Sequence, residues 1–485
     1  MKLNISFAKF KQNHKNKINQ IIFTVNKCKS YSKVENLFKF LLVEKNSFIF
    51  ESVEKGKLRG RYTIIGLNPD KMWDIKDKNI NIKSSGKLKR IKSNPLKFLN
   101  NLIDKFEMKI PQELPSMASM LVGYFSYDVI RYIENIPNKC KDDLKIPDVR
   151  ILRPKSLVIY DNLKKKIFYI ENIFSDTKID NYFEKYQQIK KNFKMFRYYE
   201  ELVLPDKFTF KTNKNKIKSN ISKARFKSIV KKAQEHITAG DIFQVVLSQR
   251  FERKFEKQPL EIYNELRKLN PSPFMFYFNF EDFKILGSSP EILVRLRNNK
   301  ITVRPIAGTR PRGKNKIQDL KFKKDLLKDK KELAEHLMLL DLGRNDVGKV
   351  SKENTVNVTE RFNIEKYSHV MHIVSNVVGS FNKKKSLFET LLAGFPAGTV
   401  SGAPKIRAME IIDKLEKNKR KLYAGGIGYF TSNKEFDTCI ALRTALIINN
   451  KFYVQSGAGI VADSKPEKEY QETVNKAKAL MKAVD

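Results

Sequence analysis

Hydrophobic positions repeat along this chain with two periods, one typical of helices and one typical of strands. Apolar residues spaced three and four apart predict helices at 94–108, 177–196, 222–239, 317–342 and 384–392. Runs rich in β-branched and aromatic residues predict strands at 48–52, 59–69, 242–252, 274–280, 283–287, 291–297, 354–362 and 370–378, a hairpin over 157–172 and three more strands between 424 and 461. Strands that follow one another in runs, with helices set apart from them, favour an α+β fold in which large antiparallel sheets pack as a sandwich.

Turn and capping residues predict several element boundaries. Ser222 is placed to cap the helix that follows it, and Asn449–Asn450 suits a type I′ turn between two strands. Asn68–Pro69 is expected to stop the strand that begins at 59. Ser464, with Glu467 three residues later, has the spacing of a capping box ahead of the last helix.

The length of 485 residues allows two regions. The segment 205–221 is polar, charged and aperiodic, which predicts a linker between an N-terminal region, 1–204, and a C-terminal region, 222–485. We expect both regions to contribute to one intertwined fold. Residues 1–20 are polar and rich in lysine, so they are expected to be frayed.

Composition narrows the class of protein. Three cysteines without a CxxC pair suit a reducing compartment, and neither a secretory signal nor an apolar run of about 18 residues is present, so we expect a cytoplasmic protein without a membrane partner. The formal charge of +42 raises the alternative of a non-enzymatic, basic nucleic-acid-binding protein. The lysines are spread over the whole chain, however, and no RNP pattern or zinc signature appears, which argues against a specific nucleic-acid partner.

The last predicted strand and helix, 456–480, carry the first group of candidate functional residues. The strand ends in Gly457–Gly459, where small side chains leave backbone N–H groups open to a ligand. On the following helix, Glu469 and Glu472 are three residues apart and project from one side. This pattern predicts a site that holds an anion through a cation. The alternative is an ordinary solvent-exposed helix.

A second group lies in 328–346. Leu333, Leu337 and Leu340 are predicted to form the buried face of this helix, Glu332 and Glu335 stand one turn apart, and Asp346 is expected just past its end. Carboxylates with oxygen-only neighbours suit Mg²⁺. Glu335 and Glu472 could meet across the sheet to hold such an ion, and a plain amphipathic helix is the alternative.

Other motifs are less specific. PIAGTRPRG (305–313) contains a Gly-Thr turn, and FPAGTVSGAPKIRAMEII (395–412) contains a Gly-rich turn before a helix but does not match a P-loop. His369 and His372 are three apart on a predicted strand, so they point to opposite faces and do not share a metal.

Taken in order, the motifs resemble those of the chorismate-utilising enzymes, and the closest resemblance is to the anthranilate synthase component I family. The motifs are NPSPFMFYF, SSPEILVR, PIAGTRPRG, ELAEHLMLLDLGRND, YSHVMHIVS, FPAGTVSGAPKIRAMEII, YAGGIGYF, TCIALRTALI and QSGAGIVADSKPEKEYQET. They cover 222–485, and FIFES, RGRYTIIG and LVGYFSYD extend the resemblance into the N-terminal half.

The resemblance implies roles for specific residues. Glu335 and Glu472 match the carboxylates that bind Mg²⁺, with Glu469 as a further ligand or close neighbour. Glu291 matches the general acid that protonates the departing 4-hydroxyl of chorismate, and His372 matches a supporting active-site histidine. The positions that match chorismate contacts are Gly308, Thr309, Tyr423, Arg443, Gly457, Ala458 and Gly459.

Two positions distinguish this chain from related enzymes. Isochorismate and salicylate synthases carry a lysine base where this chain has Gln244, and an amide cannot take a proton near neutral pH. Aminodeoxychorismate synthases often carry a nucleophilic lysine where this chain has Ala307. The resemblance therefore implies a free amine nucleophile and anthranilate as product, with aminodeoxychorismate synthase component I of the folate pathway as the alternative.

The resemblance also implies partners. A separate glutamine amidotransferase subunit is expected to supply ammonia, which makes the enzyme a hetero-oligomer. L-Tryptophan is expected as a feedback inhibitor, because Ser52, Pro271, Ser272 and Pro273 match its contacts. The alternative is that these residues are only a strand end and a turn, in an enzyme insensitive to tryptophan.

Overall fold

The computed structural model describes residues 2–52, 60–202, 216–367 and 370–484 and confirms the α+β class. The helices are α1 (Phe7–Lys15), α2 (Tyr31–Leu41), α3 (Pro95–Asp104), α4 (Tyr182–Glu201), α5 (Lys223–Thr238), α6 (Pro259–Leu269), α7 (Lys316–Lys328), α8 (Lys330–Gly348), α9 (Leu387–Ala393), α10 (Lys405–Leu415) and α11 (Pro466–Met481). The strands of the N-terminal half are β1 (Gln20–Lys27), β2 (Ser47–Glu51), β3 (Tyr62–Lys76), β4 (Asn79–Ser84), β5 (Lys87–Lys92), β6 (Met120–Phe125), β7 (Val149–Asp161) and β8 (Lys166–Ile173). Those of the C-terminal half are β9 (Lys218–Ser219), β10 (Gln244–Lys254), β11 (Phe274–Asn279), β12 (Lys284–Ser289), β13 (Ile292–Arg297), β14 (Lys300–Val303), β15 (Ile306–Pro311), β16 (Asn357–Lys366), β17 (Val370–Ser380), β18 (Gly402–Ala403), β19 (Gly426–Thr431), β20 (Phe436–Ile440), β21 (Thr444–Ile448) and β22 (Lys451–Ile460).

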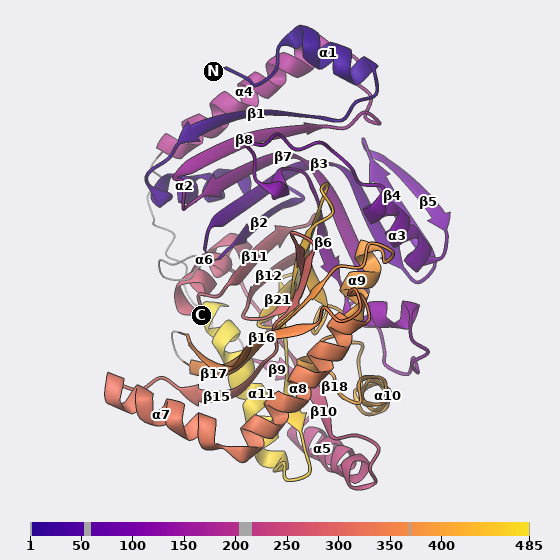
Figure 1. The fold of residues 1–485 in the computed structure, drawn as a ribbon, viewed down its shortest axis with the longest axis vertical. Helices are drawn as coiled ribbons and strands as arrows, with labels where there is room; N and C mark the ends of the chain where they lie inside the picture. Colours follow the sequence, from indigo (N-terminus) through magenta and orange to yellow (C-terminus); the bar gives the residue numbers. More distant parts are fainter. Residues whose placement is uncertain (1, 53–59, 203–215, 368–369, 485) are drawn as a thin grey trace.

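The antiparallel sheet divides into two arms at β7. One edge of β7 pairs with β3, and its other edge pairs first with β6 and then with β8. From β3, the first arm continues through β2, β11, β12, β21 and β22 to β10. From β6, the second arm continues through β19, β20, β13 and β14 to β17, which also pairs with β15 and β16. Both arms therefore begin in the N-terminal half and end in the C-terminal half (Figure 1).

The helices that carry the predicted carboxylates lie on different arms. α8 packs against β15 and β17 of the second arm, whereas α11 packs against β22 and β10 of the first (Figure 1). Two helices distant in sequence therefore lie on the two arms of one sheet.

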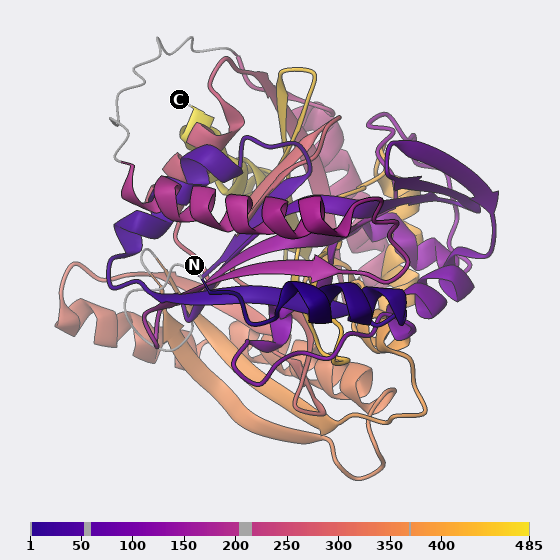
Figure 2. The same ribbon diagram turned by 90° about the horizontal axis from the view of Figure 1, so that it is seen from above.

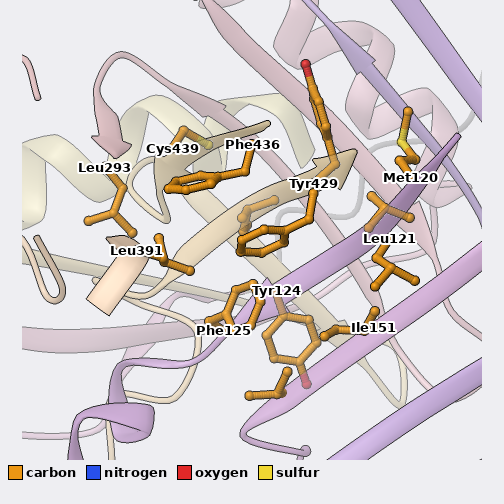
Figure 3. Packing of buried hydrophobic residues seen from close by; sticks show 14 of the residues in the cluster. Met120, Leu121, Tyr124, Phe125, Ile151, Leu293, Leu391, Tyr429, Phe436 and Cys439 are labelled. Carbon is orange, nitrogen blue, oxygen red and sulfur yellow. The ribbon is translucent and has the colours of Figure 1, made fainter. Parts of the chain in front are cut away.

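A hydrophobic core built from both halves of the chain holds the arms together. Figure 3 shows Phe125 of β6 on the same side as Leu391 of α9 and Phe436 of β20, with Tyr124 of β6 nearby, whereas Tyr429 of β19 points away from them. Tyr124 is 0 % exposed and the ring of Phe125 lies 6.0 Å from that of Phe430 in an edge-to-face arrangement. Burying large aromatic side chains of this kind contributes strongly to stability.

Residues 2–20 are ordered, contrary to the prediction of a frayed end. Ser6 caps α1 by accepting a hydrogen bond from the Lys9 N–H. Phe10 is completely buried and stacks on Tyr186 of α4 at 5.7 Å, and Figure 2 shows α1 and α4 over the strands of the N-terminal half. A few apolar residues spaced along a lysine-rich segment suffice to dock it, because lysines on the outer face remain in water.

Two other element predictions were wrong for local reasons. Asn68–Pro69 does not end its strand: β3 runs through Pro69 because Asn68 adopts φ +51° and a bulge shifts the register. The helix predicted at 317–342 is two helices, α7 and α8, since the side chain of Asp329 accepts hydrogen bonds from Lys331 N–H and Glu332 N–H and starts a new helix.

The faces of α8 and the start of α11 also differ from the predictions. Leu337 is 40 % exposed whereas His336 is fully buried, and Asp346 lies within α8 rather than past its end. The cap of α11 is Lys465, with no side-chain hydrogen bond, because the Ser464 hydroxyl accepts from the Val461 N–H instead. Glu467 pairs with Lys223 and Lys227, so the predicted capping box does not form.

Other boundaries follow the sequence closely. Ser222 caps α5 by accepting from the Arg225 N–H, and Asn449 and Asn450 both have positive φ, as a type I′ turn requires. The proposed linker falls largely on 203–215, outside the described residues, so the division of the chain at 205–221 stays a prediction.

Candidate functional site

The centre of the candidate site is the end of β22. The register places Ser248 of β10 opposite Gly457 and Val246 opposite Gly459. A Cβ on Gly459 would lie 2.6 Å from Nε2 of Gln244 and 3.9 Å from a carboxylate oxygen of Glu335, so a larger residue there would displace the Gln244 amide. Glu335 therefore lies directly beside the strand end, as the sequence suggested.

The open edge of β22 exposes alternate backbone groups. β21 pairs with β22 only as far as Val454, so the edge away from β10 has no strand partner beyond it. Lys476 donates to the Gly457 carbonyl on that edge at 3.0 Å. Because the N–H and C=O of one strand residue point to the same edge, the amides of Gly457 and Gly459 are available, whereas that of Ala458 is directed toward β10. The Ala458 side chain is buried on the opposite sheet face.

The carboxylates of α8 and α11 surround this strand end. Glu335 accepts a hydrogen bond from Gln244 Nε2 at 2.9 Å. Burial raises the pKa of Glu469, and the nearby Glu472 carboxylate raises it further. Although burial alone lowers the pKa of Lys331, this pKa is raised by pairing with Asp463 and by the charges of Glu469 and Glu335. The charge of Lys331 therefore interacts with carboxylates on both helices, Glu335 of α8 and Glu469 of α11.

The donor chemistry at this place fits Mg²⁺. Glu335, Glu469 and Glu472 offer oxygen ligands, which a hard cation prefers. The three carboxylates are not close enough to one another to bind a metal ion together in this conformation. The described residues contain no cluster of three or more Asp, Glu, His or Cys side chains spaced to share one ion. Lys476 Nζ instead lies 2.6 Å from Glu472 Oε1. The residues fit the metal provided that Glu472 exchanges this lysine for it.

Gly308, Thr309 and His372 form a second group. Gly308 has φ +68°, and a Cβ there would also crowd Ile373, Leu326 and an oxygen of Glu332. Thr309 pairs with His372 across β15 and β17. His372 Nδ1 lies 3.0 Å from the Gly308 carbonyl and 3.1 Å from Thr309 Oγ1. Donation from Nδ1 to that carbonyl leaves Nε2 as an acceptor, and burial lowers the pKa of His372 to about 4, so the ring is neutral at pH 7.

Glu291 is a buried carboxyl group at the entrance to β13. It is 5 % exposed, and burial raises its pKa to about 8, although a hydrogen bond from Thr399 and the charge of Arg443 act in the opposite direction. The Thr399 hydroxyl lies 3.2 Å from Glu291 Oε1. A carboxyl group that is protonated at neutral pH can act as a general acid.

Arg443 and Tyr423 complete the predicted substrate contacts. Arg443 has φ +47°, and among the described residues no hydrogen bond contributes to the pKa of its guanidinium. Burial lowers its pKa, while the charges of Tyr367 and Glu291 oppose this change. Burial raises the pKa of Tyr423 to about 12, and its hydroxyl would lie 2.6 Å from a Cβ on Gly457. A partly buried arginine suits a carboxylate ligand.

The residues predicted to bind tryptophan also lie close together. Glu51 pairs with Met275 across β2 and β11, which brings Ser52 next to the Pro271–Pro273 segment. Ser52 Oγ is buried without a hydrogen-bond partner in the described part of the chain. Ser272 is 1 % exposed and donates to the Ser289 carbonyl at 2.5 Å. His369, in contrast, lies outside the described residues.

Three contacts in the site were missed at the sequence level. Lys476 is four residues after Glu472, a helical spacing that could have indicated their ion pair. Thr399 belongs to the Gly-rich turn, which gave no sign of its bond to Glu291. Arg310, next to Thr309, is held by Asp325, Asp329 and Glu332 at 2.6, 2.7 and 3.0 Å and fixes β15 to the junction of α7 and α8.

Comparison with known proteins agrees with this geometry. The family model described as chorismate binding enzyme matches residues 45–482. The anthranilate synthase component 1 of Cereibacter sphaeroides is 45 % identical over 486 residues, covering 99 % of this chain and 97 % of that protein. The protein of the same name from Aquifex aeolicus is 45 % identical over 449 residues, covering 92 % and 90 %.

Solved structures give the same result. The crystal structure of anthranilate synthase component I from Streptococcus pneumoniae matches with a TM-score of 0.78 and 36 % identity, covering 88 % of this chain and 94 % of that one. The menaquinone-specific isochorismate synthase of Escherichia coli matches with a TM-score of 0.73 over 99 % of both chains at 19 % identity, which supports the fold alone. Every helix in the described ranges is too short or too polar to cross a membrane, and the cytoplasmic location expected from the sequence stays a prediction.

Proposed function

This chain belongs to the chorismate binding enzyme family, and we propose that it is the large subunit of an anthranilate synthase, converting chorismate and ammonia to anthranilate and pyruvate in tryptophan biosynthesis. The observation that carries the proposal is a buried Glu291, with a pKa of about 8, acting in the same site as Arg443. Such a pair suits the elimination of a hydroxyl group from a substrate that is held by its carboxylates.

Each residue of the site has its own role in the proposed reaction. Arg443 and Thr309 bind and orient the substrate, together with the amides of Gly457 and Gly459. Ammonia adds at C2, the ring double bonds shift, and the C4–O bond breaks as Glu291 gives its proton to the departing hydroxyl, which leaves as water. Loss of pyruvate from the amino intermediate then gives anthranilate. His372, neutral at pH 7, offers Nε2 as a hydrogen-bond or proton acceptor beside the ring.

Mg²⁺ held by Glu335 and Glu472, with Glu469 as a further ligand or close neighbour, would supply positive charge for the ring carboxylate. The chain's own cations do not replace it, because Lys331 is paired with Asp463 and Lys476 with Glu472.

Two positions favour this product over those of related enzymes. Gln244 donates its amide hydrogen to Glu335 and cannot act as a base that activates water. Ala307 supplies no amine nucleophile. The amino group must therefore arrive as ammonia, and we propose that a glutamine amidotransferase subunit delivers it within a hetero-oligomer. The relatives named component 1 support the existence of a second component.

We further propose that L-tryptophan inhibits the enzyme through the site formed by Ser52, Pro271, Ser272 and Pro273. A buried hydroxyl of Ser52 that lacks a described partner and its position beside the Pro271–Pro273 segment support a ligand there. The bond from Ser272 to Ser289, two residues before Glu291, offers a direct contact route to the catalytic acid.

A product assay tests the proposed function. The purified protein is incubated with chorismate, Mg²⁺ and ammonium at mildly alkaline pH, and anthranilate is followed by its fluorescence. We expect anthranilate without any other enzyme. A product that becomes aromatic only after a separate lyase is added would instead identify an aminodeoxychorismate synthase. Salt-sensitive retention of DNA without chorismate turnover would favour the nucleic-acid-binding alternative.

A further inference from the structure

The segment 398–405, called the bridging segment below, lies between α8 and the first arm of the sheet. Its short strand β18 pairs with the first two residues of β10, and the Val246 N–H of β10 donates to the Ser401 carbonyl at 2.9 Å. The helix α10, which begins at Lys405, packs against β10 and β18. The bridging segment therefore extends the first arm at the end where β10 lies.

One stripe of α8 faces the bridging segment. The stripe consists of Glu335, Leu339, Leu342 and Asp346. These positions are four, three and four residues apart, so they lie on one side of the helix. A Cβ on Gly398 would lie 2.1 Å from Leu342 and 3.4 Å from Leu339, which shows how closely the segment approaches the helix. Because α8 also packs against β15 and β17 of the second arm, it contacts both arms.

A polar contact lies at each end of this stripe. At one end, Gln244 of β10 donates to Glu335 Oε1 at 2.9 Å. About three turns and about 17 Å further along α8, Lys405 Nζ donates to Asp346 Oδ2 at 2.8 Å. The side chains of this ion pair are 12 % and 5 % exposed. Both contacts join α8 to neighbouring parts of the first arm, since β18, which ends two residues before Lys405, pairs with Gln244.

The stability of the two helices does not explain why these charges are present. Lys405 is the first residue of α10, and Asp346 lies in the last turn of α8. A helix dipole favours negative charge at the N-terminus and positive charge at the C-terminus, so each residue carries the less favourable sign for its own helix. Removing two charges from water is also costly. The pair therefore has its benefit in the contact between α8 and α10.

This contact affects where the predicted metal ligands lie. Glu472 is on α11, which packs against β10 and β22 of the first arm, whereas Glu335 is on α8. The distance that separates the two glutamates consequently depends on how α8 is held against the first arm.

We propose that Lys405 is a positioning residue: its ion pair with Asp346 holds α8 against the bridging segment, at the position from which Glu335 and Glu472 bind one Mg²⁺. This inference rests on the proposed function. Without the pair, α8 keeps its hydrogen bond at Glu335 but loses the one at its other end, and the helix tilts.

Lys349 provides a matched control. Its Nζ lies 3.5 Å from Oδ1 of Asp346, but its side chain is 62 % exposed and it directly follows α8 in the chain. Lys349 can therefore neutralise the Asp346 carboxylate, but it does not join α8 to the first arm.

The test measures the Kd for Mg²⁺ by titration calorimetry, with chorismate present and no nitrogen source, for the wild type, Lys405→Met and Lys349→Met. We expect Lys405→Met to raise this Kd about tenfold, as is typical when a residue that orients a metal ligand is lost, and Lys349→Met to keep the wild-type value. With ammonium, the Mg²⁺ concentration for half-maximal rate should rise in parallel, while kcat at saturating Mg²⁺ stays close to that of the wild type. A Lys405→Met protein with a lower thermal midpoint and an unchanged Kd for Mg²⁺ would overturn the proposal.

Lys405→Met leaves Asp346 buried without this partner and so could fail to fold. In that case Lys405→Met is combined with Asp346→Asn, which removes both charges, and this double variant should show the same rise in Kd for Mg²⁺. A wild-type Kd in the double variant would overturn the proposal.

The reversed pair, Lys405→Asp with Asp346→Lys, restores the attraction and gives each helix the sign of charge that its dipole favours. It should return the Kd for Mg²⁺ to near the wild-type value, and a Kd as high as that of the double variant without charges would count against the ion pair. A wild-type protein that forms no anthranilate contradicts the proposed function, whereas an active wild type whose variants all bind Mg²⁺ equally well contradicts the role of Lys405 alone.

Discussion

At the scale of single residues, the account depends on how burial sets protonation. Glu291 and His372 are both enclosed, and burial disfavours the charged form of each. The pKa of the acid therefore rises to about 8 and that of the histidine falls to about 4. At neutral pH the site holds a proton donor and a neutral proton acceptor, while Arg443 keeps its charge for the substrate.

The pH dependence of the rate follows from Glu291. Its carboxyl must be protonated to act, so kcat/KM for chorismate should fall as pH rises through about 8, with the concentration of neutral ammonia kept constant. Glu291→Gln should lower kcat about 100-fold or more, and the decrease in kcat/KM above pH 8 should disappear. If Glu291→Gln has a near-normal rate and the same pH profile as the wild type, the general acid is a residue other than Glu291.

The stability of the protein should also reflect this group. The unfolded carboxyl loses its proton above its ordinary pKa of 4.5, whereas the folded one keeps it up to about 8, so the free energy of unfolding falls as pH rises between these values. Glu291→Gln removes this term. Its midpoint in urea should decline less than that of the wild type from pH 5 to pH 8, and parallel declines would contradict the assigned protonation.

At the scale of elements, α8 and α11 bring Glu335 and Glu472 from separate arms to the strand end. The sequence predicted these helices, and also that their glutamates could meet, because the helical spacing and the family motifs are local. It did not predict that Lys476 pairs with Glu472. A carboxylate can be neutralised either by a metal ion or by a lysine, and the sequence pattern does not distinguish between the two.

Removal of either carboxylate should disable the reaction. We expect Glu335→Gln and Glu472→Gln each to lower kcat/KM at least about 100-fold, with high Mg²⁺ restoring it only in part, because one ligand is lost. Glu467→Gln, on the same helix but paired with Lys223 and Lys227, is the control and should remain active. Full activity of Glu335→Gln or Glu472→Gln in a buffer that contains a metal chelator would show that the reaction does not need Mg²⁺ at this site.

Another element-scale prediction concerns α1. A lysine-rich composition suggested a frayed end, but composition does not show that Phe10 packs on Tyr186. Phe10→Ala should lower the free energy of unfolding by about 3 kcal/mol, because it empties a fully buried site. Lys11→Ala, on the exposed face, should have little effect. Equal denaturation midpoints for Phe10→Ala and Lys11→Ala would show that α1 does not pack on the rest of the protein.

At the scale of the whole molecule, the branching of the sheet at β7 could not be predicted from the sequence. Local patterns gave most strands, yet they do not state that β2 pairs with β11 or β6 with β19, since such pairings depend on the complete core. This arrangement is what places Ser52 and Ser272 near the strand that leads to Glu291. The motif order supplied the same residues, but only as a resemblance.

Inhibition by tryptophan should depend on this connection. Ser272→Ala removes the bond to Ser289 and should raise the tryptophan concentration for half-inhibition about fivefold, the effect of one lost hydrogen bond of about 1 kcal/mol. Ser288→Ala loses a similar buried bond, to the Asn270 carbonyl, and is the control. Identical inhibition curves for the wild type and Ser272→Ala would separate this serine from regulation.

The central claim is that this fold adds ammonia to chorismate and removes pyruvate in a single active site. Its most direct test measures chorismate consumed, anthranilate formed and pyruvate released in one reaction with ammonium and Mg²⁺. The account predicts equal amounts of all three for the wild-type protein, and formation of both products about 100-fold or more slower for Glu291→Gln. Chorismate consumed without an equal release of pyruvate would contradict it.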